Sequence, residues 1–305
     1  MLALKQVQKI WSVRPSGILV PAGWITDGAT NLEVFDFQKL KDKAVEIENL
    51  YKKANIVLRP DSELGRMIQN TKDYCEFRSL GKPCSWNSFF LCLHLDRLAK
   101  AILPLQNEDQ QTQCLYLEKL LSGTLDFFKR EKSEAKSFLW ELEVWSWLRE
   151  KTKNVKLEEP DITVNYSGSR IGIACKKLYS EKHVQNVLSE GVGQIEKEFE
   201  FGIVAINIDE LLPENSVLKA ENTNIASEII QKNNDIFLNK HSRHFEKYFS
   251  KSRIISTIIS TSVLIDIPSQ KPQFSNMYRR IVWTVSGLSI KHKEQLDNFY
   301  NTVMN

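Results

Sequence analysis

The sequence has no CxxC pair, and its cysteines are few. Its 305 residues contain five cysteines, an odd number, scattered from position 75 to position 175. Neither a cysteine-rich zinc site nor a framework of disulfides fits this spacing. Because disulfide-stabilised domains belong to oxidising compartments, the sequence predicts a reducing, cytoplasmic environment.

Long hydrophobic runs are missing as well. The most apolar stretch, Ile254 to Ile267, is interrupted by Ser, Thr and Asp, and it is shorter than the roughly 20 residues of a membrane-spanning helix. Lys5 interrupts the start of the chain, so we expect no secretory signal, which needs an apolar core of roughly 7–15 residues. With 12 Gly and 9 Pro, the composition is not that of a low-complexity chain. We expect a folded protein with no membrane partner.

No large excess of one charge marks the whole chain, since 41 basic residues balance 38 acidic ones for a net charge of +3. This balance excludes a strong overall field that attracts nucleic acid or membranes. Locally the charge is uneven, because the segment from Asp235 to the end contains ten Lys and Arg residues but only five Asp and Glu residues. The densest part fits either a phosphate-binding surface or a solvated helix face. Its basic residues are Lys240, Arg243, Lys247, Lys251 and Arg253.

The length predicts roughly two domains. We expect residues 1–130 to be mostly helical, because apolar residues recur at helical spacing over 35–54, 87–103 and 113–130. This region contains no recognisable chemistry. Residues 131–305 are expected to form an α/β domain.

The α/β prediction rests on the order of elements after Lys132. Ser137 to Glu150 has the pattern of an amphipathic helix. Two short strands, Asp161–Tyr166 and Arg170–Cys175, surround a Ser-Gly-Ser turn and predict a hairpin. The remaining predicted elements are helix 181–199, strand 202–208, helix 224–249, and strands 254–267 and 280–285. This order predicts one mixed sheet flanked by helices.

Acidic and basic residues of this second region occur in an order that suits one chemistry. A pair of glutamates, Glu141 and Glu143, lies on the predicted helix, Asp161 opens the first hairpin strand, and Lys176 closes the second. Carboxylates hold Mg²⁺ against a scissile phosphate, and a nearby lysine orients the attacking water or steadies the phosphate. The pattern therefore points to metal-assisted hydrolysis of phosphodiesters.

In these motifs the sequence resembles the PD-(D/E)XK nucleases, which have the restriction-endonuclease-like fold. The resemblance covers about residues 133–290 and includes Pro160-Asp161, the Cys175-Lys176 pair, the helical acid and Gln194 on the following helix. It implies that Asp161 and the backbone carbonyl of Cys175 hold Mg²⁺ or Mn²⁺, that Lys176 is the catalytic lysine, and that Gln194 assists near the phosphate. Lys177 joins the basic residues expected to bind nucleic acid.

One position departs from the family. The second acid, two residues before the lysine, falls on Ala174, and a methyl group cannot bind a metal. Three explanations remain open: a deliberate acid-to-alanine substitution that blocks cleavage, a natural protein that binds without cutting, or an acid supplied from elsewhere by Glu141 or Glu143. On a helix, Glu141 shares the apolar face of Trp145 and Leu148, so we rank Glu141 ahead of Glu143.

The sequence thus predicts a metal-dependent nuclease, weakened or inactive with Ala174, with DNA favoured over RNA as the substrate. The alternative is a non-catalytic nucleic-acid-binding or scaffold protein that retains the fold. Restriction, phage defence and DNA repair are all compatible settings, and a homodimer is a further expectation because such domains often pair to cut both strands.

Overall fold

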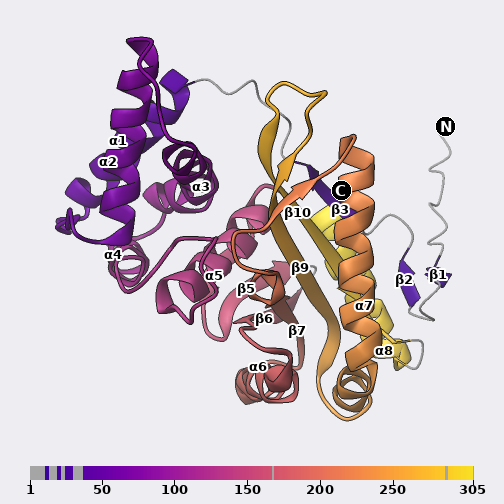
Figure 1. Cartoon of the computed structure of the whole chain (residues 1–305). Coiled ribbons are helices and arrows are strands. Elements are labelled where there is room, and N and C mark those ends of the chain that lie inside the picture. The colour runs from indigo at the N-terminus through magenta and orange to yellow at the C-terminus, as the bar shows by residue number, and fades with distance from the viewer. Residues whose placement is uncertain are drawn as a thin grey trace, which may run out of the picture.

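A single mixed β-sheet forms the centre of the computed structural model, which describes residues 11–13, 19–21, 25–29, 37–166, 168–285 and 288–304. Helices flank the sheet, and a helical region lies to one side of it (Figure 1). The predicted class, a mixed α/β sheet flanked by helices and preceded by helices, is confirmed at this level. Among the described residues, no helix has the length and apolarity needed to cross a membrane.

The helical region consists of α1 (Phe37–Lys53), α2 (Glu63–Ser79), α3 (Trp86–Ile102), the 3-10 helix η1 (Leu103–Asn107) and α4 (Gln110–Lys119). Helices α2, α3 and α4 each begin after an N-cap residue. The side chains of these residues, Ser62, Ser85 and Asp109, each accept a hydrogen bond from a backbone N–H of the first turn. The helix predicted over 113–130 ends at Lys119 instead. A turn follows, in which Gly123 has a φ of 106°, a conformation that interrupts a helix.

Three short strands precede the helices. Strands β1 (Trp11–Val13) and β2 (Leu19–Pro21) pair with each other. Strand β3 (Ile25–Ala29) instead pairs antiparallel with β10 (Phe274–Trp283), at the far end of the chain. The backbone of residues 25–29 therefore belongs to the sheet of the second region, which the sequence did not predict.

The other strands of the sheet are β4 (Val155–Glu158), β5 (Asp161–Tyr166), β6 (Ser169–Lys177), β7 (Phe201–Asn207), β8 (Val217–Lys219) and β9 (Ile254–Asp266). Their order is β3-β10-β9-β7-β6-β5-β4, with β8 beside the end of β9. Strands β6, β7 and β9 are parallel, so their carboxyl ends meet at one edge. All seven residues of β7 are buried, as expected of a parallel strand covered on both faces.

Helix α5 (Glu134–Arg149) covers one face of this sheet, and α6 (Val184–Glu198) and α7 (Thr223–Phe249) cover the other. On the α5 face, the indole N–H of Trp140 donates to the carbonyl of Ala205 in β7. On the opposite face, Gly191 of α6 passes close to Ala174. Short 3-10 turns η2 (Glu181–His183) and η3 (Asp209–Leu211) follow β6 and β7, and α8 (Ile290–Met304) ends the described chain.

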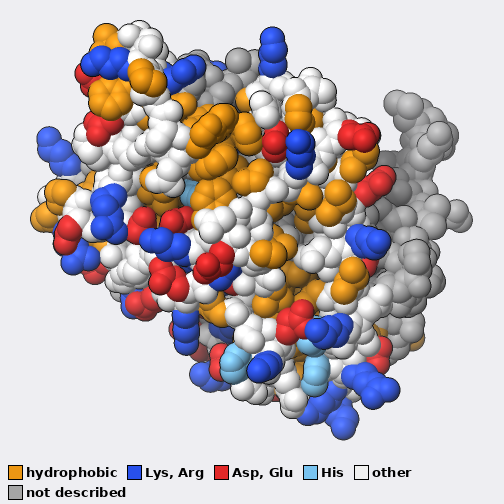
Figure 2. Space-filling view, in the orientation of Figure 1, with side chains coloured by type: hydrophobic (Ala, Val, Ile, Leu, Met, Phe, Trp, Pro, Cys, Tyr) orange, Lys and Arg blue, Asp and Glu red, His pale blue; other side chains and the backbone are white. Residues whose placement is uncertain are grey.

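Aromatic side chains join the helical region to the β9–β10 hairpin. The Trp86, Phe89 and Phe90 rings of α3 each lie edge-on to Phe274, with centroids 5.4–5.7 Å apart. Figure 2 shows hydrophobic side chains gathered where the helical region meets this hairpin. Phe89, Phe90 and Phe274 are partly buried in this contact, whereas Trp86 stays exposed, so apolar packing of the phenylalanine rings helps to hold the helical region to the sheet.

Candidate active site

Asp161 lies where the pairing between β5 and β6 ends. Strand β5 begins with this residue, while β6 continues past it to Lys177. The last ladder pair joins Ile162 to Ile173, which leaves Cys175 and Lys176 past the end of the pairing. The Asp161 carboxylate occupies this place, where its Oδ2 accepts a hydrogen bond of 2.6 Å from the Cys175 N–H. The carboxylate is therefore fixed in the plane of the sheet, beside the end of β6.

The ammonium group of Lys176 lies against the same carboxylate, with 3.7 Å between its Nζ and Asp161 Oδ2. Both side chains are mostly buried, with exposed fractions of 18% and 14%. Burial raises the pKa of Asp161, while the Lys176 charge and the Cys175 N–H partly oppose this shift. The net pKa lies above the usual aspartate range, since desolvation is the largest of these effects.

Glu141 brings a second carboxylate to this place from α5. Burial raises its pKa, and the neighbouring Asp161 charge raises it further. The Tyr116 hydroxyl donates to Glu141 Oε2 at 3.2 Å and opposes part of the shift. A buried carboxyl group whose proton affinity is raised by a neighbouring carboxylate, beside a lysine, is typical of a metal or acid–base site.

Glu143 occupies a different place. Its two carboxylate oxygens accept from Nε and Nη2 of Arg97 at 2.5 and 3.0 Å. The second nitrogen also donates to Asp209. The two glutamates of α5 therefore separate, with Glu141 beside Asp161 and Glu143 in an ion-pair network with α3 and η3.

The backbone of Cys175, rather than its thiol, faces the site. Within a strand, the N–H and C=O of one residue point the same way, so the Cys175 carbonyl points to the side on which its N–H meets Asp161. The thiol is buried, and burial raises its pKa well above the usual value. The thiol therefore lies away from solvent, whereas the carbonyl lies on the same side of the strand as Asp161.

Gln194 reaches the site from α6. Its Nε2 donates to the carbonyl of Pro160 at 3.3 Å, while its Oε1 is buried and has no partner among the described residues. The amide thus holds the residue that precedes Asp161, and its oxygen remains available to a donor.

Ala174, at the position of the second family acid, is fully buried on the α6 face. A Cβ atom added to Gly191 would lie 3.5 Å from its methyl group, which shows how closely α6 approaches. No group of three or more His, Cys, Asp or Glu side chains within the described ranges is arranged around a common metal position. Two carboxylates and a carbonyl nevertheless fit Mg²⁺, which usually binds through one or two carboxylates and keeps several waters.

Lys177 does not lie where the sequence placed it. Its ammonium donates to Asn207 Oδ1 at 2.6 Å and lies 3.5 Å from Glu210 Oε1, with a side chain only 2% exposed. Because strand side chains alternate, Lys177 points to the α5 face, opposite to Ala174 and Lys176. The prediction that Lys177 binds nucleic acid is wrong for this reason.

The basic residues of α7 and its following turn are exposed, and Figure 2 shows Lys and Arg side chains around the end of the molecule where α7 ends in Figure 1. Lys240 pairs with Glu181 in η2. Arg253 donates to the carbonyls of Glu196 and Phe199 at the end of α6. Arg243, Lys247 and Lys251 complete this surface, which we call the α7 basic surface.

Sequence reasoning missed Tyr116. This residue belongs to α4, in the region where no chemistry was recognised, and it reaches Glu141 only because α4 packs on α5. No motif or spacing in the sequence marks such a contact.

No protein-family model matches the sequence, and searches of curated proteins and of solved structures found no match either.

Proposed function

We propose that this chain is a metal-dependent phosphodiesterase that cleaves nucleic acid, with DNA as the expected substrate, and that it is a divergent relative of the PD-(D/E)XK nucleases. The convergence of Asp161, Lys176 and Glu141 at the open end of the β5–β6 pair carries the proposal. The leading helix, the hairpin and the following helix occur in the order that the resemblance implies.

Asp161, Glu141 and the Cys175 carbonyl would hold Mg²⁺ or Mn²⁺. When bound, such an ion neutralises charge on the phosphate and lowers the pKa of a water molecule. The protein itself contributes carboxylate and carbonyl oxygens that are held in fixed orientations. The Cys175 N–H fixes Asp161, and the Tyr116 hydroxyl orients Glu141.

Lys176 has two roles in this proposal. Next to Asp161, its positive charge favours the ionised carboxylate that a metal requires. Its three N–H donors also suit a phosphate oxygen or an attacking water at the same place. Gln194 acts as a positioning residue through Pro160, and its unpaired Oε1 is an acceptor for a water.

The position of Glu141 favours one explanation of Ala174, namely that the second acid comes from α5. The methyl of Ala174 faces α6, whereas the Glu141 carboxylate lies close enough to Asp161 to shift its own pKa. In this arrangement the function needs no acid at position 174.

The test is cleavage of labelled single-stranded DNA, duplex DNA and RNA with Mg²⁺, with Mn²⁺ and with EDTA. We expect metal-dependent cleavage that Asp161→Asn and Glu141→Gln each reduce by at least about 100-fold, the scale of a lost catalytic group. Glu190→Gln, an exposed glutamate of α6, is the matched control and should cleave like the unsubstituted protein. Loss of cleavage in the control too, or no cleavage by any form, contradicts the proposal.

A second candidate is a nucleic-acid-binding protein without cleavage. The methyl group at Ala174 and the lack of a three-ligand cluster in the described chain favour it. It predicts salt-sensitive DNA binding in EDTA that is indifferent to Asp161→Asn.

A further inference from the structure

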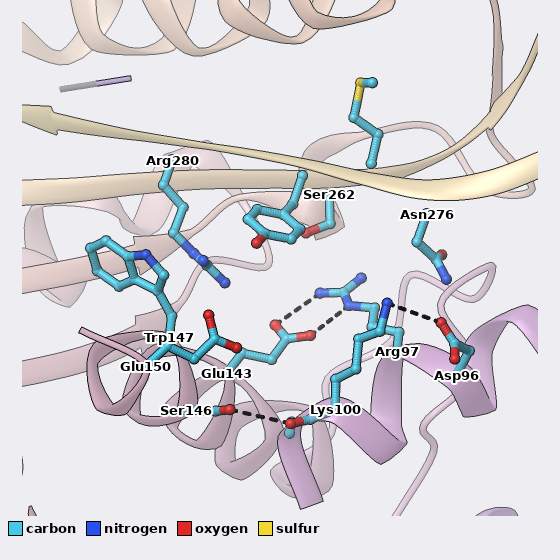
Figure 3. A pocket seen from close by; sticks show the side chains of 13 residues that line it. Asp96, Arg97, Lys100, Glu143, Ser146, Trp147, Glu150, Ser262, Asn276 and Arg280 are labelled. Atoms are coloured by element: carbon cyan, nitrogen blue, oxygen red, sulfur yellow. Dashed lines mark hydrogen bonds and ion pairs between the residues drawn. The ribbon is translucent and has the colours of Figure 1, made fainter. Parts of the chain in front are cut away.

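A cavity of about 330 Å³ lies between α3, α5 and the sheet, away from Asp161. Its walls come from α3, from the outer part of α5 and from strands β9 and β10 (Figure 3). Small-molecule sites have volumes of roughly 300–1,000 Å³, so the cavity has room for a small molecule. Asp161 in β5 and Arg280 in β10 are four strand spacings apart, about 19 Å across the sheet.

Arg280 gives this cavity an unusual charge. Its side chain is only 6% exposed, and its Nε and Nη1 atoms are buried without a hydrogen-bond partner in the described part of the chain. A guanidinium remains charged at any ordinary pH. An unpaired buried charge costs free energy that a ligand of opposite charge would recover.

Three other charged groups of the cavity wall are paired with one another or with Arg97, whereas the exposed Glu150 has no ion pair among the described residues. Arg97 binds Glu143, and Lys100 lies 3.2 Å from Asp96, as the dashed lines in Figure 3 show. Among the described residues of the cavity wall, no carboxylate pairs with Arg280. Arg280 is therefore the buried charged group of the wall that lacks an ion-pair partner in the described part of the chain, and Glu150 is the exposed, unpaired acid of that wall.

Two aromatic rings hold the Arg280 side chain in place. Its guanidinium carbon lies 4.2 Å from the centre of the Tyr278 ring and 5.2 Å from that of Trp147, which is itself only 7% exposed. Such stacking orients the planar guanidinium without using its N–H donors. A fixed arginine with unpaired N–H donors matches an oxygen of a phosphate or a carboxylate.

We propose that this cavity binds a small molecule through an oxyanion group, a phosphate or a carboxylate, held by Arg280. The rest of the wall supplies polar groups for the body of such a molecule, including the hydroxyls of Ser146 and Ser262. Because α3 and the sheet both contribute, a bound ligand would join the helical region to the second region. The proposal does not depend on the nuclease proposal.

The test measures binding to the full chain by isothermal titration calorimetry and by the shift in melting temperature. The probes are inorganic phosphate, 5′-AMP and succinate at millimolar concentrations. We expect saturable binding of at least one of them, and Arg280→Met should weaken it by at least about ten-fold, the value of one charged hydrogen bond. Tighter binding of 5′-AMP than of phosphate would identify a phosphate ester, and binding of succinate alone would identify a carboxylate.

Arg170→Met is the matched control. Arg170 also stacks on a ring, with 4.6 Å to the centre of Phe199, but it is exposed and paired with Glu158. Its replacement should leave binding unchanged, and so should Asp161→Asn, which separates this site from the nuclease site.

Arg280→Lys keeps the charge but loses the planar donors, so it should also weaken binding if Arg280→Met fails to fold. If neither variant folds, hydrogen exchange on the unsubstituted protein decides, because a ligand in the cavity should protect residues 143–150. Absence of binding by all three probes, or equal binding by a folded Arg280 variant, overturns the proposal.

Discussion

Lys176 and Lys177 are neighbours in the sequence, yet their ammonium groups lie on opposite faces of the sheet. Lys176 approaches Asp161 at 3.7 Å, whereas Lys177 is buried against Asn207 and Glu210. The alternation of strand side chains separates the two. One lysine is thus assigned to the candidate site and the other to the interior.

Replacing the two lysines should therefore have opposite consequences. Lys176→Ala should reduce nuclease activity strongly. It should change the free energy of unfolding by at most about 1 kcal/mol, because Asp161 keeps its hydrogen bond from the Cys175 N–H and can take up a proton. Lys177→Ala should cost about 1–3 kcal/mol, because it removes a buried hydrogen-bond donor from Asn207 Oδ1, although Glu210 keeps its ion pair with Lys136. Urea unfolding and cleavage assays on both variants measure the difference, and equal stability losses would contradict the assignment.

Glu141→Gln should make the metal-free protein more stable at alkaline pH. The folded-state pKa of Glu141 is raised, so the folded protein holds this proton longer than the unfolded chain does. The unsubstituted protein therefore has its full free energy of unfolding below the ordinary glutamate pKa. That free energy falls as the pH rises from there through the raised folded-state pKa of Glu141. A folded-state pKa that is higher by one pH unit corresponds to a change of about 1.4 kcal/mol in the free energy of unfolding.

The measurement is the unfolding free energy with EDTA at several pH values. The variant should match the unsubstituted protein at acid pH and exceed it at alkaline pH. A variant that is less stable throughout the range would show that Glu141 is a structural acid. Because a metal needs both carboxylates ionised, metal binding by the unsubstituted protein should strengthen with pH over the same range.

The ion pair between Lys136 and Glu210 should be required for stability. These side chains are 0% and 1% exposed, and their charged atoms lie 3.1 Å apart. Glu210→Gln removes the charge that compensates two buried lysines, so we expect a loss of about 3–5 kcal/mol. Glu134→Gln, which breaks an exposed pair with Lys119, is the control and should cost at most about 1 kcal/mol in the same urea titration.

Ala174→Glu tests where the second acid belongs. Because Ala174 is fully buried and faces α6, a glutamate there must displace Gly191 or turn along the strand toward Asp161. If Glu141 supplies the second acid, we expect Ala174→Glu to lower the melting temperature and to leave cleavage no faster. Metal-dependent cleavage that rises by orders of magnitude would instead identify position 174 as the natural place of the acid.

The α7 basic surface should govern affinity for nucleic acid rather than cleavage chemistry. Replacing Arg243, Lys247 and Lys251 by Gln should weaken DNA binding. It should also reduce the slope of log K against log salt by about 0.7–0.9 for each phosphate that the protein no longer neutralises. Lys52, Lys53 and Arg66, exposed in the helical region, form the control set. An equal effect of both sets would show that these charges act only through the net charge of the chain.

Local patterns in the sequence determined the elements and their order around the site. Strand β5 has the predicted bounds, and α5 and α7 differ from prediction by a few residues at most. These elements follow from periodicity and capping, which depend on near neighbours in the chain. The order of helical acid, Asp161, Lys176 and Gln194 was visible for the same reason.

Only the tertiary structure decided which side chains meet. The pairing of β3 with β10, the contact of Tyr116 with Glu141 and the burial of Lys177 each join segments that are distant in sequence. The cavity at Arg280 likewise needs α3, α5 and β10 in one place. Such contacts are set by how apolar faces pack, and periodicity within one element carries no information about its partner.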